Sequence, residues 1–269
     1  TTTTTTTPVA PPSATTVQNH TTGVYNDYTV DNTGGLIASQ YSQSKQTIPH
    51  YYLSIELDLT KLMAVRQTLK TDSASDISVL DFMIRAAALS MKNVPDVNAT
   101  WMDTFVRRHE NVDINIVMSS NNSIVGASDH GLTFPMLRQT QNMGLNSIAN
   151  HMENFEETFH NGDININNTN ISDIGVGVGT FTIHNAGQYG IKSIAPIIHP
   201  SQSCALGIGA IIDTVVPNTT TDTENDNWRI APVVMVTLSC DHRVIDGAIG
   251  ASYLQSFKNL VENPMRMLL

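Results

Sequence analysis

Residues 241–247 read Asp-His-Arg-Val-Ile-Asp-Gly and form the most informative stretch of this 269-residue chain. An apolar run, residues 233–238, precedes the stretch, and the residues that follow it place apolar side chains at helical spacing. The pattern predicts a strand, a turn and a helix, with His242 in the turn. Because the neighbouring elements fix its backbone, such a turn can hold an imidazole rigidly and leave one ring nitrogen free to act as a base. The alternative is a histidine buried in an ordinary turn.

Composition divides the chain into a tail and one large domain. Residues 1–26 consist largely of Thr, Pro, Ala and Ser, which cannot bury enough surface to offset the entropy of ordering, so we expect a flexible linker there. Residues 27–269 are expected to form one domain, since 41% of the chain is hydrophobic and no second linker or repeat is visible. The chain begins at Thr1 without a secretory signal, as a fragment or a processed chain would.

Charge and cysteine content argue against several classes of protein. The formal net charge is −10, and the 14 Lys and Arg residues form no basic cluster that could track phosphates, so we expect no nucleic acid partner. No apolar run approaches the roughly 20 residues that span a bilayer, so no membrane partner is expected. Cys204 and Cys240 form no Cys-x-x-Cys motif, which favours a reducing compartment over a disulfide framework or a zinc site. Asp163 and Asp173 fit no EF-hand spacing, so no metal is expected.

The remaining periodicity predicts a layered domain. We expect, in chain order, a strand, two helices and two strands at residues 55–58, 60–69, 78–92, 97–102 and 112–117. Ser78 and Asp81 resemble a capping box at the start of the second helix, and Pro95 is expected to end that helix. Residues 161–178 are rich in Asn and Gly, which predicts a loop. Strands alternating with helices indicate an α/β or α+β layered domain.

The motif at residues 241–247 closely resembles the active-site motif of the 2-oxo acid dehydrogenase acyltransferases, which move an acyl group from dihydrolipoamide to coenzyme A. Further segments that resemble this family lie at residues 42–53, 179–183, 190–192, 197–200, 204–210 and 261–269. The two segments predicted as strands at 97–102 and 112–117 resemble its pyruvate-type branch. The resemblance extends from about Tyr28 to Leu269, with interruptions at residues 118–137 and 161–178.

The resemblance implies the fold of chloramphenicol acetyltransferase, a two-layer domain with a mixed sheet and helices on one side. It implies a homotrimer with active sites at the subunit boundaries, and trimers that build a cage of 24 or 60 subunits. The implied substrates are coenzyme A and an acetyl group carried by the lipoyl group of a separate domain. The implied partners are lipoyl domains and the pyruvate-decarboxylating and dihydrolipoyl dehydrogenase components, in the mitochondrial matrix.

By the same resemblance, His242 is the general base that deprotonates coenzyme A, which then attacks the acetyl-thioester carbonyl directly. A neutral imidazole with an unperturbed pKa of about 6.5 suits that step. Asp241, Arg243 and Asp246 are expected to hold the turn. The family also carries a turn that lines the coenzyme channel, and this chain resembles it at Gly131, Leu132, Thr133 and Pro135.

Two regions of the chain depart from the family pattern. Where the family has a serine that donates to the oxyanion across the trimer interface, this chain has His184, whose ring N–H could donate instead, with Thr182 and Asn185 close by in sequence. Where the family has an Arg-Arg pair and a further arginine, this chain has Gly34-Gly35 and Gln40. One of those arginines pairs with the second aspartate of the motif, so Asp246 is predicted to lack its partner.

Two functions remain open on this basis. The first is an active acetyltransferase in the core of a pyruvate dehydrogenase complex, supported by the complete motif. The second is a structural subunit of the same core that binds the dehydrogenase and contributes little chemistry, supported by His184 and Gly34-Gly35. A free acetyltransferase acting on a small amine or alcohol is less consistent with the tail, which suggests a tethered carrier.

Overall fold

The computed structural model describes residues 32–72, 76–119, 132–160, 178–218 and 228–267. The predicted linker at residues 1–26, the start of the predicted domain and nearly all of the Asn-rich stretch at 161–178 lie outside the described residues. Within them, no helix is long and apolar enough to cross a membrane.

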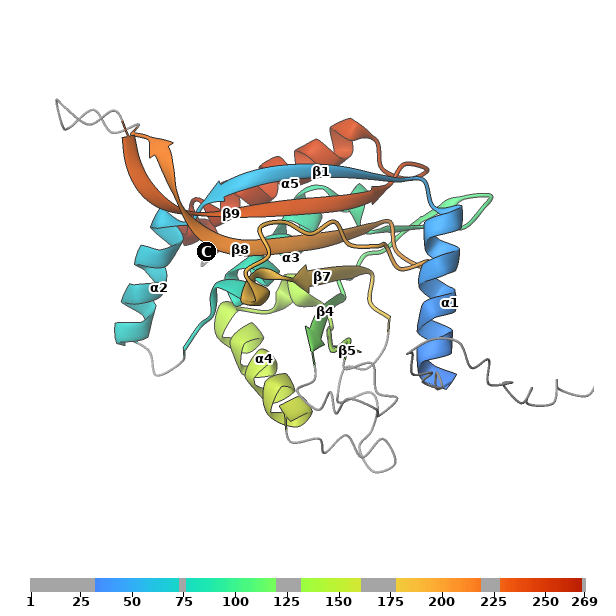
Figure 1. Ribbon diagram of the computed structural model, residues 1–269, viewed down its shortest axis with the longest axis horizontal. Coiled ribbons are helices and arrows are strands. Elements are labelled where there is room, and N and C mark those ends of the chain that lie inside the picture. The colour runs from blue at the N-terminus through green and yellow to red at the C-terminus, as the bar shows by residue number, and fades with distance from the viewer. Residues whose placement is uncertain (1–31, 73–75, 120–131, 161–177, 219–227, 268–269) are drawn as a thin grey trace, which may run out of the picture.

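A mixed sheet forms the centre of the described fold, with the strand order β1-β9-β8-β7-β4-β5 and with β6 paired to β4 (Figure 1). Strand β7 runs parallel to both of its neighbours, β4 and β8, and the other pairs are antiparallel. The strands are β1 (His50–Asp58), β4 (Ile114–Ser119), β5 (Leu132–Thr133), β6 (Met136–Leu137), β7 (Phe181–Asn185), β8 (Cys204–Pro217) and β9 (Trp228–Asp241). A separate two-stranded sheet pairs β2 (Ala99–Trp101) with β3 (Val106–Arg108).

Helices α3 and α5 cover one face of the sheet, and Figure 1 shows both running behind the strands. The helices are α1 (Asn32–Thr47), α2 (Thr60–Asp72), α3 (Val79–Asn93), α4 (Leu145–His160) and α5 (Gly247–Val261). Short 3-10 turns lie at Pro95–Val97, Thr140–Asn142, Gly187–Tyr189 and Pro264–Met267. The capping box predicted for α3 is confirmed, because the Ser78 hydroxyl accepts from the Asp81 amide and the Asp81 carboxylate accepts from the Ser78 amide.

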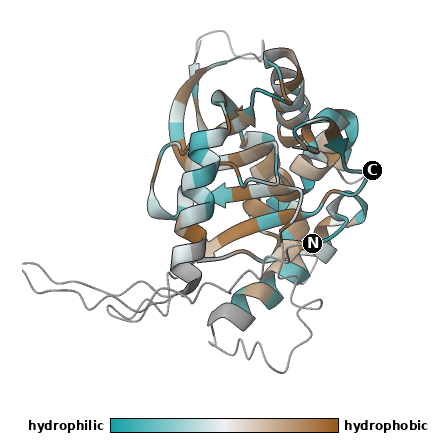
Figure 2. Ribbon diagram, turned by 90° about the vertical axis from the view of Figure 1, so that its right-hand side faces the viewer, coloured by the Kyte–Doolittle hydropathy of each residue, from teal (hydrophilic) through white to brown (hydrophobic). Residues whose placement is uncertain are grey.

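The core lies between this sheet face and the helices. Alternate strand residues such as Ile116 and Ile183 point into it and meet Phe82 and Phe257 of the helices, all of them fully buried. Figure 2 shows the hydrophobic residues concentrated along the central strands. Burial of each large side chain of this kind contributes about 1.5–3 kcal/mol. The predicted layered architecture therefore depends on strands that bury alternate residues against the helices.

The opposite face of the sheet is crossed by the segment between β7 and β8. This segment lies so close to β8 that a Cβ atom at Gly207 or Gly209 would overlap the carbonyl oxygens of Ile194 and Lys192. The Ser239 hydroxyl of β9 donates to the carbonyl of Pro196 in the same segment, at 2.6 Å. Side chains on this face, His184 among them, therefore lie beneath a backbone segment and away from the helical layer.

Helix α1 is the exception among the helices, because it contacts the second face at the end where β9 ends and β1 begins (Figure 1). The Ser44 hydroxyl of α1 donates to the Ile198 carbonyl, and Lys45 donates to the Tyr52 hydroxyl at 2.5 Å. This helix thus forms one wall of the region around His184.

The boundaries differ from the sequence prediction in one informative place. The strand predicted at residues 97–102 begins only at Ala99, because Pro95–Val97 form a 3-10 turn directly after α3. Proline at the first position of that turn has its φ angle fixed and no N–H to contribute to a ladder, so the chain turns before it extends. The strand predicted at residues 112–117 is found at Ile114–Ser119.

Candidate active site

The turn that carries His242 joins β9 to α5, as the sequence predicts. The backbone amide of His242 donates to the Pro49 carbonyl at 3.1 Å, which anchors the turn to the start of β1. The amides of Val244 and Ile245 both donate to the Asp241 carbonyl, at 3.1 and 2.9 Å. The imidazole itself is exposed. A rigid backbone and an accessible ring are the two properties that a general base on a turn requires.

Asp241 and Arg243 lock the first half of this turn. Asp241 is only 1% exposed, and Arg243 donates to both of its carboxylate oxygens, with Nη2 at 2.8 Å and Nε at 3.0 and 3.2 Å. The guanidinium also lies over the Trp101 ring, 5.3 Å from its centroid. A buried carboxylate without this partner would be strongly destabilising, so the pair maintains the shape of the turn.

Asp246 lies at the other end of the turn, where α5 begins. It is expected to lack an arginine partner because Gly34-Gly35 replace the family's arginines; its carboxylate is exposed and caps α5, accepting from the Ile249 amide at 2.8 Å. An exposed N-cap aspartate satisfies a helix amide and needs no buried counter-ion. Within the described residues Asp246 forms no ion pair, which agrees with the loss of the arginines, and its exposure to solvent avoids the cost of a buried unpaired carboxylate.

His184 lies on β7, on the second face of the sheet, and its ring opens into an apolar pocket of about 370 Å³. The walls include Tyr41 of α1, Phe134 and Ile191. Burial lowers the pKa of His184 to about 4, so the ring is neutral at pH 7. Among the described residues neither ring nitrogen has a hydrogen-bond partner, which leaves one N–H available to a ligand in the pocket.

Of the two neighbours of His184 that were considered as donors, Thr182 is already engaged as a donor among the described residues and Asn185 is not. Thr182 is buried and donates to Oε1 of Gln202 at 2.7 Å. Asn185 lines the pocket, and its Oδ1 accepts from the Gly187 amide at 3.0 Å, which does not use the Nδ2 donor. Thr182 is thus not available as an oxyanion donor, whereas His184 and Asn185 both line the pocket.

Of the turn predicted to line the coenzyme channel, few residues line this pocket. Gly131 lies outside the described residues, and Leu132 and Thr133 pair with β4 as the backbone of β5. Pro135 is buried, and its carbonyl accepts from the Ile116 amide at 2.9 Å. The residue that lines the pocket from this turn is Phe134, which belongs to the resembling segment but was not assigned to the coenzyme channel.

His184 and His242 are far apart in one chain. In the sheet register His184 lies opposite Gly207, which lies opposite Thr237, and His242 follows five positions later. About five residues along a strand and two strand spacings separate the residues by roughly 15–20 Å. One substrate carbonyl cannot contact both rings, so a shared site would need residues of two chains.

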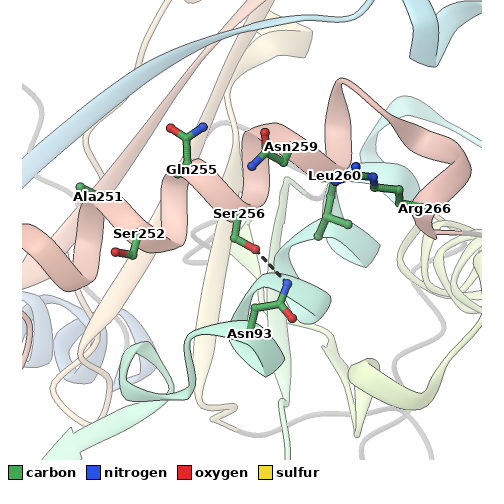
Figure 3. Close-up of a pocket in the computed structure, with 8 residues that line it drawn as sticks. All are labelled: Asn93, Ala251, Ser252, Gln255, Ser256, Asn259, Leu260 and Arg266. Atoms are coloured by element: carbon green, nitrogen blue, oxygen red, sulfur yellow. Dashed lines mark hydrogen bonds between the residues drawn. The ribbon is translucent and has the colours of Figure 1, made fainter.

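A second hollow lies along α3 and α5 (Figure 3). Its lining is mainly amide and hydroxyl side chains, and Asn93 donates to the Ser256 hydroxyl across it at 3.0 Å. The hollow contains neither of the two candidate histidines. It therefore offers no base for acyl transfer.

The low pKa of His184 predicts a pH-dependent stability. The unfolded chain binds a proton at about pH 6.5 and the folded chain only near pH 4, so the free energy of unfolding should fall as pH drops through this window. The His184 share is about 2 kcal/mol between pH 7 and pH 5. Urea unfolding at the two pH values should show this loss in the parent and in His151→Gln, which alters an exposed residue of α4, but a smaller loss in His184→Gln. Equal losses in all three would contradict the assignment.

Comparison with known proteins identifies the class. A family model described as 2-oxoacid dehydrogenases acyltransferase (catalytic domain) matches residues 24–269. This chain therefore belongs to the 2-oxoacid dehydrogenase acyltransferase family. Its described fold is that of an acyltransferase catalytic domain.

Curated relatives come from mitochondria and from bacteria. The mitochondrial dihydrolipoyllysine-residue acetyltransferase component of the pyruvate dehydrogenase complex of Dictyostelium discoideum is 38% identical over 247 residues, 92% of this chain and 36% of the relative. The corresponding component of Rickettsia bellii is 36% identical over 238 residues, 87% of this chain and 52% of the relative. The chain thus spans about a third to a half of these relatives.

Solved structures of the same class confirm the predicted two-layer fold of the chloramphenicol acetyltransferase type. A probable dihydrolipoamide acetyltransferase from Listeria monocytogenes superposes with a TM-score of 0.75 at 25% identity, covering 89% of this chain and 95% of that one. The dihydrolipoamide acetyltransferase of Azotobacter vinelandii gives a TM-score of 0.77 at 22% identity, covering 92% of this chain and 95% of that one.

Proposed function

We propose that this chain transfers an acetyl group from S-acetyl-dihydrolipoamide, carried on a separate lipoyl domain, to coenzyme A in the core of a pyruvate dehydrogenase complex. The observation that carries the proposal is the exposed imidazole of His242 on a turn fixed by a buried ion pair and a helix cap. The named activity of the relatives at 36–38% identity supports the acetyl group as the cargo.

In the proposed reaction, His242 takes the proton from the coenzyme A thiol, and the resulting thiolate attacks the carbonyl carbon of the acetyl thioester. The new C–S bond places a negative charge on the carbonyl oxygen, to which the neutral His184 ring donates. When the tetrahedral intermediate collapses, the bond to the dihydrolipoamide sulfur breaks and that sulfur receives the proton from His242. A positioned base contributes about 10²–10⁴ in rate, and an oxyanion donor about 10²–10³.

The separation of the two histidines supports a site built from two subunits. The imidazole of one chain and the His184 pocket of its neighbour then face the same thioester, which is the arrangement of a homotrimer with sites at its boundaries. The apolar lining of the pocket, from Tyr41, Phe134 and Ile191, suits the alkyl arm of a thioester better than a charged ligand. Trimers of this kind assemble into the larger cage.

The complex as a whole supplies the remaining proposed partners. The chain would receive acetyl groups that the pyruvate-decarboxylating component loads onto lipoyl domains, and a dihydrolipoyl dehydrogenase would reoxidise the carrier. The mitochondrial relatives favour the mitochondrial matrix as the compartment, although the Rickettsia relatives show that the family also serves bacteria.

A structural subunit of the same core is the second candidate. The observation that favours it is the imidazole at position 184, which fills more of the pocket than a serine hydroxyl would.

An assay of the purified chain with free S-acetyl-dihydrolipoamide and coenzyme A distinguishes the two functions. The proposal expects acetyl-coenzyme A to form at a rate proportional to the concentration of the chain. If acetyl-coenzyme A forms no faster with the chain than without protein, the enzymatic function is refuted and the structural role remains.

A further inference from the structure

Tyr51 of β1 contacts both ends of the turn that carries His242. Its ring centroid lies 4.8 Å from the imidazole centroid, with the two planes inclined by 50°. Its hydroxyl donates to the backbone carbonyl of Asp246 at 2.7 Å. The same carbonyl accepts from the Gly250 amide at 3.0 Å and so belongs to the first turn of α5. One side chain therefore touches the base and is tied to the helix that follows it.

The sheet register explains how Tyr51 reaches this position. Tyr51 pairs with Cys240 on β9, two residues before His242, and consecutive strand residues point to opposite faces. Tyr51 therefore faces α5, whereas Tyr52 faces α1, where its hydroxyl accepts from Lys45. The two neighbouring tyrosines occupy different faces of the same strand.

Gly250 provides the space that this contact needs. A Cβ atom at Gly250 would lie 3.1 Å from the Tyr51 hydroxyl oxygen and 2.7 Å from Cδ1 of Leu53. Glycine in a helix interior costs about 1 kcal/mol relative to alanine, so a close approach of the strand is a physical reason for its presence. The bare helix backbone allows Tyr51 to reach the Asp246 carbonyl.

Burial raises the pKa of Tyr51 well above its ordinary value. The hydroxyl therefore remains protonated throughout the neutral range and keeps its role as a donor.

We propose that Tyr51 is a positioning residue for His242, which restrains the imidazole by ring contact and fixes the turn through the Asp246 carbonyl. The inference rests on the proposed function, in which His242 must point its free nitrogen at a thiol. Misdirecting a base affects the transition state more than substrate binding, because proton transfer depends on alignment while the substrate keeps its other contacts.

Three variants separate positioning from general packing. Tyr51→Phe keeps the ring and removes the hydrogen bond, Tyr51→Leu removes both, and Tyr52→Phe is the matched control on the other face. Acetyl transfer to coenzyme A should fall about three- to tenfold in Tyr51→Phe, the effect of one neutral hydrogen bond. It should fall on the order of 10²-fold in Tyr51→Leu. The KM for coenzyme A should stay within about twofold of the parent in both.

Hydrogen exchange gives a readout that does not depend on activity. Mass spectrometry of the peptide covering residues 242–250 should show faster amide exchange in Tyr51→Phe than in the parent, and unchanged exchange in Tyr52→Phe. Parent-like turnover in folded Tyr51→Leu, or parent-like exchange in Tyr51→Phe, would overturn the inference. If the parent transfers no acetyl group, the proposed function fails instead, and the exchange comparison alone decides whether Tyr51 holds the turn.

Discussion

Replacing His242 by alanine is expected to lower acetyl transfer from S-acetyl-dihydrolipoamide to coenzyme A by about 10²–10⁴, the contribution of a positioned general base. The turn should survive the change, because His242 is anchored through its backbone amide and the ion pair of Asp241 and Arg243 does not involve the ring. The exposed imidazole is not part of the hydrophobic core and contacts only its edge through the Tyr51 ring, so thermal unfolding should remain near that of the parent.

The control for this experiment is His151→Ala, which removes an exposed histidine on α4. Turnover should be unchanged in the control and nearly lost in the His242 variant, measured at saturating concentrations of both substrates. Full turnover in a folded His242→Ala protein would show that another group removes the thiol proton.

Replacing His184 by alanine is expected to lower turnover by a factor on the order of 10²–10³ with little change in coenzyme A affinity. The reason is that a neutral ring N–H at the pocket stabilises the oxyanion, which exists only after the thiolate has attacked. His184→Ser should match or exceed the parent, because it returns a small hydroxyl donor and frees the volume that the ring occupies.

The serine variant also separates the two proposed functions. If the parent is inactive and His184→Ser is active, the imidazole is the group that prevents catalysis, and the parent is a structural core subunit. If parent, alanine and serine variants all show only the uncatalysed rate, the acetyltransferase proposal is wrong for this chain. Unchanged turnover in His184→Ala would remove the oxyanion role from this residue.

Local features of the fold were predictable from the sequence. The strand, turn and helix around His242 follow from apolar spacing, and the α3 capping box follows from Ser78 and Asp81, which are three residues apart. Both depend on neighbours in the chain, where periodicity and capping chemistry carry the information. The late start of β2 was missed because Pro95 was recognised only as the end of a helix, and not as the start of a 3-10 turn.

Contacts between distant segments were not predictable in the same way. Tyr51 and Asp246 are 195 positions apart, and only the pairing of β1 with β9 brings them together. The cap that Asp246 forms on α5 was not predicted for a related reason, since the cap and the exposure of Asp246 depend on how the turn sits on the fold. The walls of the His184 pocket come from α1, β4, the Phe134 segment and the β7–β8 segment, whose meeting no local pattern encodes.

Co-assembly of two inactive variants tests most directly whether the site is shared between chains. When His242→Ala and His184→Ala chains are denatured, mixed in equal amounts and refolded together, some boundaries will combine an intact His242 from one chain with an intact His184 from its neighbour. Random assembly should restore about a quarter of the parent turnover, whereas each variant refolded alone should stay inactive. Mixed assemblies, confirmed by mass spectrometry, that remain as inactive as the separate variants would contradict a site built from two subunits.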